Sequence, residues 1–180
     1  MKELSLHILD IVQNSIAAKA ENIKIVIKED LDDNIFKIII EDDGEGMTKK
    51  KSENVLDPFV TSRTTREVGL GLPFLKKAAE SCNGDFSLES EPGKGTKIKA
   101  NFEHDHIDRA PLGNITDTLI TLITTNKELD FFYYHLYNNK EFRFSTKEIK
   151  KEIDGISINN IEIINWIKDY INENLSNLRK

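Results

Sequence analysis

The sequence lacks the features that mark secreted, membrane and nucleic-acid-binding proteins. It has one cysteine, Cys82, so no disulfide can form within the chain, and its apolar neighbours predict a buried, unreactive thiol. No apolar run approaches the ~20 residues of a membrane-spanning helix, and residues 1–10 lack a signal-peptide pattern. A net charge of -6 argues against broad nucleic-acid affinity. We therefore expect a cytoplasmic protein that binds neither DNA nor membranes.

An acid and an amide share one face of the first predicted helix. Apolar residues recur every three or four positions over residues 6–16, the pattern of an amphipathic helix. Asp10 and Asn14 lie four positions apart and so project from the same face. Their oxygens could hold a hydrated Mg²⁺, although a solvated polar stripe would contain the same residues.

Asp42 ends an apolar strand predicted over residues 35–40. It enters a tight turn that contains Gly44 and Gly46, where no side chain obstructs the backbone. A buried carboxylate at this place needs a hydrogen-bond donor, and the amino group of adenine is one. A plain aspartate-glycine turn is the alternative interpretation.

A second glycine pair, Gly69 and Gly71, precedes a helical pattern over residues 72–79. Pro73 is tolerated there because the first turn of a helix needs no backbone donor. The free N–H groups and positive dipole of the helix start would suit phosphate groups. A helix that needs only a flexible entry is the alternative.

Five motifs in this order resemble those of the GHKL superfamily, the ATP-binding domain of gyrase, heat-shock chaperones, sensor histidine kinases and MutL-type ATPases. The resemblance covers residues 1–104. The Gly-x-x-x-x-Gly-Lys-Ser/Thr motif of P-loop proteins is absent. The matching segments are the N box at 10–20, the first glycine box at 42–47, the lid entry at 58–63, the second glycine box at 69–72 and the closing hairpin at 91–96.

The resemblance implies ATP and Mg²⁺ as ligands and gives each motif a role. It implies that Asn14 ligates Mg²⁺ and that Asp42 accepts a hydrogen bond from the adenine amino group. The remaining nucleotide contacts that it implies are Gly44, Gly46 and Met47 at the base, Gly69, Leu70, Gly71 and Leu72 at the phosphates, and Thr96 at the adenine.

Two departures from the family pattern concern turnover. Hydrolytic members carry glutamate where this chain has Asp10, the candidate catalytic acid that would polarise the attacking water. Aspartate is one methylene shorter, so the water must come closer or the rate falls. MutL-like enzymes also carry an acid where Ala17 stands. The pattern thus favours ATP binding and leaves hydrolysis open.

The predicted fold class is α/β, a two-layer sandwich of the histidine kinase-like ATPase (Bergerat) type. Strands predicted over 23–28, 86–89 and 97–102 alternate apolar and polar residues, which fits a mixed sheet with helices on one face only.

Residues 48–68 have few periodic apolar positions and suit a mobile lid over the nucleotide. In this lid, Arg63 and Arg66 are either phosphate contacts or solvated charges.

Residues 105–180 are predicted to form a small α+β module of unknown function. The pattern indicates a helix after Asn114, a hairpin around 138–139, and two helices that begin near Ser145 and Asn159. A helix-and-hairpin module could bind DNA, but 10 basic and 12 acidic residues give a net charge of 10 - 12 = -2 without a basic stripe. The aromatic residues over 131–137 fit core packing, or a protein-binding surface if exposed.

His104 and His106 fit a polar linker better than a metal site.

Three functions are compatible with this sequence. The first is a nucleotide-dependent regulatory protein that binds a protein partner. The second is a serine kinase similar to anti-sigma factors, and the third is a slow stand-alone ATPase. His7 lies too close to Asn14 to be the phospho-accepting histidine of a sensor kinase, so we do not expect a complete sensor kinase. The oligomeric state is left open.

Overall fold

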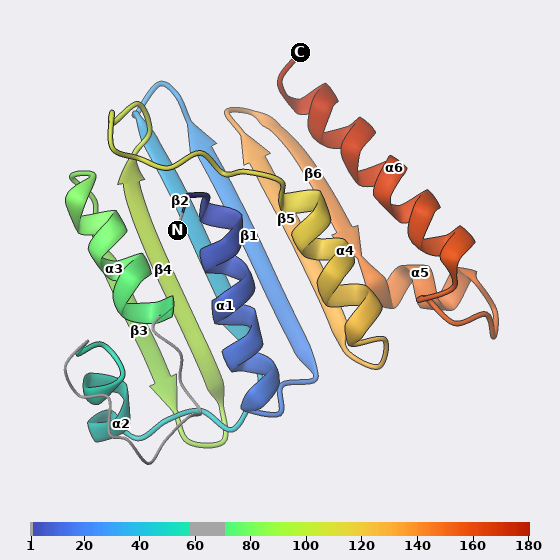
Figure 1. Ribbon diagram of the computed structural model, residues 1–180, viewed down its shortest axis with the longest axis horizontal. Coiled ribbons are helices and arrows are strands. Elements are labelled where there is room, and N and C mark those ends of the chain that lie inside the picture. The colour runs from blue at the N-terminus through green and yellow to red at the C-terminus, as the bar shows by residue number, and fades with distance from the viewer. Residues whose placement is uncertain (1, 58–70) are drawn as a thin grey trace.

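A six-stranded mixed sheet organises the described part of the chain, with helices on one of its faces (Figure 1). The computed structural model describes residues 2–57 and 71–180. The strand order is β3-β4-β2-β1-β5-β6. The strands are β1 (Asn22–Asp30), β2 (Ile35–Asp42), β3 (Phe86–Glu91), β4 (Gly95–Glu103), β5 (Asp130–Tyr137) and β6 (Lys140–Ser145). The helices are α1 (Leu4–Ala17), α2 (Lys49–Asn54), α3 (Gly71–Ser81), α4 (Ile115–Thr125), α5 (Thr146–Glu152) and α6 (Ile161–Leu178).

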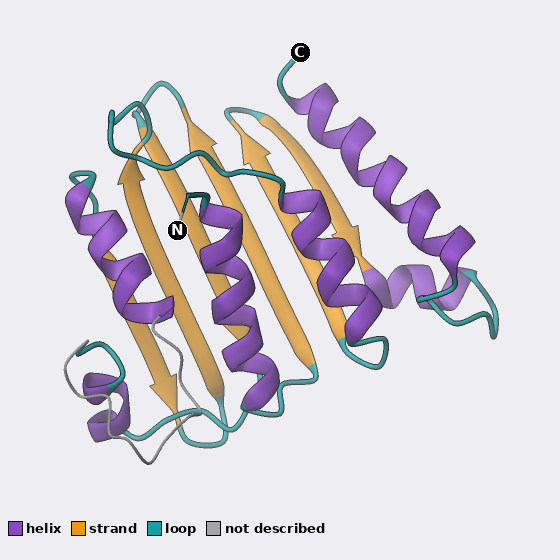
Figure 2. Cartoon of the chain, viewed as in Figure 1, coloured by secondary structure: helices purple, strands orange, loops and turns teal. Residues whose placement is uncertain are grey.

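The two faces of the sheet differ as the alternating pattern predicts. On β1, Ile23, Ile25 and Ile27 are buried beneath the helices, whereas Lys24 is exposed on the opposite face. Figure 1 and Figure 2 show α1, α3 and α4 lying in one layer in front of the strands, with α6 beside the β6 edge. Burial of one face of the central strands and of one stripe of the longer helices stabilises this two-layer arrangement. The predicted two-layer α/β sandwich is confirmed.

The C-terminal segment continues the same sheet. Strand β5 pairs in parallel with β1, where Ile25 lies opposite Tyr133, and β6 returns antiparallel beside β5. The hairpin turn has Asn138 at φ 50°, a left-handed conformation that asparagine tolerates and that this tight turn requires. The predicted units 1–104 and 105–180 therefore contribute strands to one sheet, and the division of the chain into these two units stays a prediction.

The helices predicted to begin near Ser145 and Asn159 begin at Thr146 and Ile161, but their capping bonds differ from the capping-box pattern. The side chain of Asn160, and not that of Asn159, caps α6 by accepting from the backbone N–H of Glu162. Ser145 precedes α5 but makes no capping bond through its side chain. Instead, the buried hydroxyl of Thr146 accepts from the Phe131 backbone N–H and ties α5 to β5.

The segment predicted as a lid lies partly outside the described residues. Its first part contains the short helix α2, which Thr48 caps by accepting a hydrogen bond from the N–H of Lys51. Arg63, Arg66, Gly69 and Leu70 fall outside the part of the chain that the structure describes. None of the described helices is long and apolar enough to cross a membrane.

Candidate nucleotide-binding site

A pocket of about 90 Å³ opens between α1, the turn after β2 and the start of α3. Its walls combine apolar side chains with a few polar groups, as small-molecule sites usually do. The polar groups converge from α1, β2 and β4, which are far apart in the sequence. Predicted site residues that line the pocket are Asn14, Asp42, Gly46, Met47, Leu72 and Thr96.

Asp42 is held at the pocket wall by two hydrogen bonds. Its Oδ2 accepts from the hydroxyl of Ser15 at 2.5 Å, and its Oδ1 accepts from the backbone N–H of Gly44 at 2.9 Å. An ionised carboxylate has about four lone-pair positions, so Asp42 can still accept a bond from a ligand. The side chain is therefore oriented before any ligand enters.

Ser15 is a contact that the sequence interpretation missed. It is 3% exposed and projects from α1 beneath the end of β2. Its position next to Asn14 is the one sequence feature that could have indicated this role. Serine is common on helices, however, and 27 residues separate Ser15 from Asp42. Only the packing of α1 against the sheet brings the two together.

Gly46 is required because two backbone segments approach each other. Its φ is +67°, and a Cβ on it would lie 2.0 Å from the carbonyl oxygen of Glu91. The N–H of Gly93 also donates to the carbonyl of Glu45 at 2.7 Å. Any side chain at Gly46 would separate the turn from the β3–β4 hairpin and open the pocket floor.

Ser90 links the turn to Thr96 and was also missed. Its hydroxyl accepts from the backbone N–H of Met47 at 2.8 Å and lies 2.8 Å from the Thr96 hydroxyl. Ser90 lies directly opposite Thr96 in the β3–β4 register, which explains the contact. The predicted base-contact residues Met47 and Thr96 are thus fixed relative to each other.

Asp10 lies where α3 begins against α1. A Cβ on Gly71 would lie 2.9 Å from the Cβ of Asp10, so only glycine permits this approach. Asp10 itself is exposed, and it lies beside the start of α3, the end of a helix at which backbone N–H groups have no partner within the helix. The structure therefore places the predicted catalytic acid next to a predicted phosphate-binding residue.

Asn14 carries an unsatisfied group inside the pocket wall. Its side-chain Nδ2 is buried and has no hydrogen-bond partner among the residues described. Such groups are rare in native proteins because each costs free energy. A ligand that brings its own polar atoms into the pocket would satisfy the amide.

Asp43, the neighbour of Asp42, has a structural task. Its carboxylate accepts from the backbone N–H groups of Glu21 and Asn22 at 2.8 and 2.9 Å, and from the Asn22 side chain at 2.7 Å. Burial acts to raise the pKa of Asp43, but these hydrogen bonds hold it below its ordinary value. Asp43 therefore fixes the turn from the side away from the pocket.

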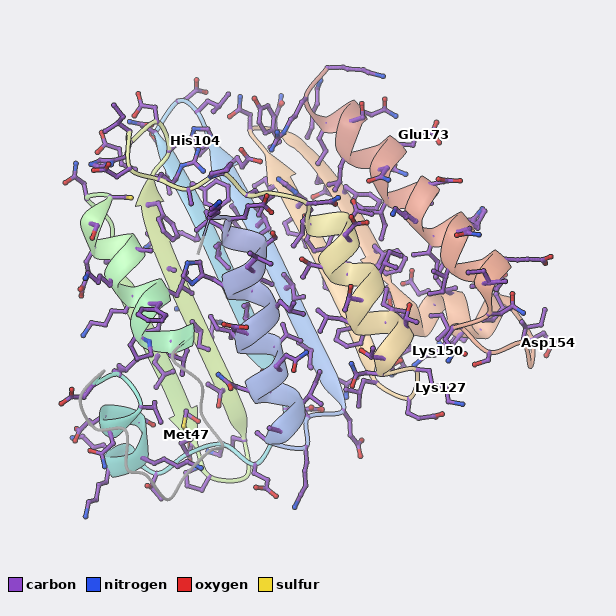
Figure 3. The ribbon with its side chains drawn as sticks, viewed as in Figure 1. Met47, His104, Lys127, Lys150, Asp154 and Glu173 are labelled. Atoms are coloured by element: carbon purple, nitrogen blue, oxygen red, sulfur yellow. The ribbon has the colours of Figure 1, made fainter. Side chains whose placement is uncertain are left out.

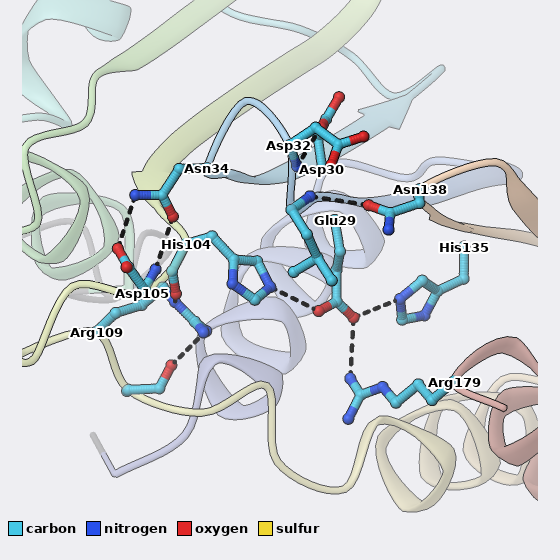
Figure 4. Close-up of polar contacts among 12 residues, drawn as sticks. Glu29, Asp30, Asp32, Asn34, His104, Asp105, Arg109, His135, Asn138 and Arg179 are labelled. Carbon is cyan, nitrogen blue, oxygen red and sulfur yellow. Dashed lines mark hydrogen bonds and ion pairs between the residues drawn. The ribbon is translucent and has the colours of Figure 1, made fainter.

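A second polar cluster lies at the other end of the sheet, around Glu29 (Figure 4). Glu29 is 4% exposed and contacts His135 at 2.9 Å, His104 at 3.0 Å and Arg179 at 2.9 Å. Burial opposes ionisation of Glu29, yet these partners lower its pKa to about 2. His104 therefore binds a buried acid, a contact that the sequence interpretation missed because 75 residues separate the pair.

The two clusters have separate locations. Figure 3 shows Met47, in the pocket wall, and His104 at opposite ends of the sheet. The Glu29 cluster joins β1, β5, the segment after β4 and the end of α6, so it connects the C-terminal segment to the rest of the sheet. It belongs to the scaffold and not to the pocket.

Comparison with known proteins shows the same family from independent data. The model of the histidine kinase-, DNA gyrase B- and HSP90-like ATPase family matches residues 2–106. Sporulation kinase E of Bacillus subtilis (strain 168) is 38% identical over 90 residues, which cover 49% of this chain and 12% of that protein. Sporulation kinase A of the same organism is 27% identical over 96 residues, with coverages of 52% and 15%.

Two further matches are a sensor kinase and a solved structure. Sensor histidine kinase YxdK of Bacillus subtilis (strain 168) is 26% identical over 108 residues, 56% of this chain and 33% of that protein. The Aquifex aeolicus MutL ATPase domain complexed with ADP has a TM-score of 0.49 at 13% identity, with 87% of this chain and 70% of that chain covered. The chain thus matches only a minor part of these kinases. Because the family model covers more than half of its residues, the chain belongs to the histidine kinase-, DNA gyrase B- and HSP90-like ATPase family.

Proposed function

We propose that this protein binds ATP with Mg²⁺ and that nucleotide binding regulates its contact with a protein partner in the cytoplasm. The observation that carries the proposal is Asp42, which Ser15 and Gly44 orient at the wall of a pocket. A fixed acceptor beside apolar walls suits the amino edge and flat face of adenine. Family membership makes a nucleotide the expected ligand.

Each part of the nucleotide has residues of suitable chemistry. Asp42 would accept from the adenine amino group, with Gly44, Gly46, Met47 and Thr96 around the base. Backbone N–H groups of Gly71 and Leu72, at the start of α3, would bind the phosphates together with those of Gly69 and Leu70, which precede them in the sequence. Asp10 and Asn14 lie one helical turn apart and supply the oxygen ligands that Mg²⁺ prefers. When bound, Mg²⁺ would neutralise phosphate charge.

A regulatory role is favoured over rapid hydrolysis because of Asp10. Glutamate in its place would reach one methylene farther toward an attacking water. Asp10 is exposed, and the α1 position of the second acid in MutL-like enzymes is Ala17 in this chain. With the shorter Asp10 and without an acid at position 17, fewer groups can position a water molecule at the phosphates. Neither difference changes the residues proposed to contact the base.

The relatives favour a protein kinase as the second candidate. Several of them are named kinases, although this chain spans 12% to 33% of the lengths of the three kinases described above. Phosphoryl transfer to a serine hydroxyl would use the same Mg²⁺ and the same backbone donors as transfer to water. A slow ATPase is the third candidate on the same chemistry.

Incubation with γ-labelled ATP and a cell extract separates these functions. We expect ATP with Mg²⁺ to raise the thermal unfolding temperature, because a ligand of the native state stabilises it. The regulatory proposal predicts little label in phosphate or protein, together with partner capture that depends on ATP. A labelled protein band would instead indicate a kinase, and rapid phosphate release an ATPase.

A further inference from the structure

Two aromatic rings lie stacked on the exposed side of α6. Trp166 is 52% exposed and Tyr170, one turn later, is 37% exposed. Their ring centroids are 5.3 Å apart and their planes differ by 10°. Single exposed apolar residues are ordinary, but a paired tryptophan and tyrosine is the composition of binding hot spots.

Core residues of the sheet hold the Trp166–Tyr170 pair in place through Tyr170. Tyr170 meets the ring of Phe142 edge-on at 5.7 Å, and Phe142 in turn meets the buried Tyr133 at 6.3 Å. Phe142 is 5% exposed, so this contact anchors Tyr170 to the sheet. An aromatic surface held in this way loses little side-chain entropy when a partner covers it.

Carboxylates surround the aromatic pair. Glu162, Asp169 and Glu173 are exposed, and their spacing with Trp166 places all four on one face of α6. None of the three acids forms an ion pair with a described residue, whereas Lys168 of the same helix is paired with Asp117 at 2.8 Å. The outer face of α6, defined by these three acids with Trp166 and Tyr170, is therefore negatively charged around an aromatic centre.

We propose that the outer face of α6 docks a basic segment of a partner protein, with an arginine side chain over the Trp166–Tyr170 pair. A guanidinium group stacks on aromatic rings and is more weakly hydrated than an ammonium group. Further cations on the same segment would face the three carboxylates. This inference rests on the proposed function, since it states the chemistry of the partner.

Other occupants fit this surface less well. Nucleic acids and anionic lipids carry the same sign of charge as the carboxylates and would be repelled. A second copy that packed α6 against α6 would oppose three acids with three acids. The face also lies apart from the nucleotide pocket, as Figure 3 shows from Glu173 and Met47 at different sides of the molecule.

Trp166 makes the surface directly measurable because it is the single tryptophan of the chain. We would titrate the full-length protein with an arginine octapeptide amide and a lysine octapeptide amide, and record tryptophan fluorescence. We expect a saturable change with both peptides, and binding of the arginine peptide several-fold tighter. No change with the arginine peptide would overturn the proposal, and equal affinities would remove the arginine contact from it.

Charge-matched variants test the location. The triple variant Glu162→Gln, Asp169→Asn, Glu173→Gln should weaken arginine-peptide binding by about tenfold or more. The control triple Asp32→Asn, Asp33→Asn, Glu128→Gln removes the same charge from exposed positions elsewhere and should bind as the parent does. Equal weakening in both triples would mean that net charge alone attracts the peptide, which contradicts a docking site.

Two more measurements separate this proposal from its alternatives. Tyr170→Ala should weaken binding while Trp166 still reports it, and unchanged affinity would contradict the aromatic contact. A fluorescence change with oligothymidylate or with phosphatidylglycerol vesicles that exceeds that with the arginine peptide would reassign the face. Thermal stabilisation by ATP with Mg²⁺, measured on every variant, shows separately whether the nucleotide proposal holds.

Discussion

The hydroxyl of Ser15 lies 2.5 Å from Oδ2 of Asp42 and connects the first helix to the end of β2. Because Ser15 is buried, this bond positions the carboxylate independently of solvent. It also places Asn14, the preceding residue, in the wall of the same pocket. The geometry of one side chain on α1 therefore determines how two predicted nucleotide contacts face each other.

Ser15→Ala should weaken ATP binding although Ser15 need not touch the nucleotide. Loss of one hydrogen bond to a charged group corresponds to about 1.5–3 kcal/mol, part of which would appear as reduced affinity. Calorimetric titration with ATP measures the effect, and Ser176→Ala on the exposed side of α6 is the control. Unchanged affinity in Ser15→Ala would mean that the orientation of Asp42 is set elsewhere.

Asn14→Ala should reduce ATP binding more in the presence of Mg²⁺ than in its absence. The substitution removes an oxygen ligand that only the metal complex uses. It also removes the buried Nδ2 that lacks a partner, so the folded protein should keep most of its stability. Titrations with MgCl₂ and with EDTA provide the comparison, and equal losses in both would show that Asn14 acts on the nucleotide or on the fold.

Asp10→Glu should increase phosphate release, and Asp10→Asn should abolish whatever basal release exists. The longer acid reaches closer to a water molecule at the phosphates, whereas the amide cannot accept its proton. Steady-state phosphate release at saturating Mg-ATP compares the three proteins. Identical rates would remove Asp10 from any catalytic role and leave it as a residue that packs beside Gly71.

Acid should destabilise the protein through Glu29. Its pKa is lowered from 4.5 to about 2 in the folded protein, so its stabilising effect is present above pH 4.5 and is lost as the pH falls toward 2. The difference corresponds to about 3 kcal/mol at most. Urea unfolding at pH 7 and pH 3 measures the part of this loss that occurs above pH 3.

Two variants test whether Glu29 causes the loss of stability at low pH. Glu29→Gln should be less stable than the parent at pH 7, because His104, His135 and Arg179 lose their charged partner. Its stability should also change less between pH 7 and pH 3. Glu128→Gln, at an exposed site, should follow the parent. A parent-like pH dependence in Glu29→Gln would assign the acid sensitivity to other groups.

Local patterns predicted the elements because each strand and helix buries a regular set of its own residues. The alternation along β1 and the three-to-four-residue spacing along α1 both report this burial. The continuation of the sheet through β5 was not predictable in the same way. Parallel pairing between β1 and β5 depends on packing between segments about 100 residues apart, and the alternation of one strand does not specify its neighbour.

The candidate site likewise contains some residues that the sequence predicts and others that only tertiary contacts bring there. A glycine such as Gly46 can be predicted from the sequence because a tight turn requires it. The structure shows the reason, which is the close approach of the Glu91 backbone to Gly46. Ser15 and Ser90 are ordinary serines in their own segments and acquire their roles only from tertiary contacts. The same holds for Glu29, whose partners come from three distant segments.

The central claim is that Asp42 recognises adenine, and calorimetric titration of the parent and of Asp42→Asn with Mg-ATP tests it most directly. The amide would direct an NH₂ group toward the adenine amino group and oppose two donors, while the size of the side chain is retained. We predict measurable binding by the parent and at least about tenfold weaker binding by the variant. Equal dissociation constants for two folded proteins, or no binding of Mg-ATP by the parent, would contradict the account.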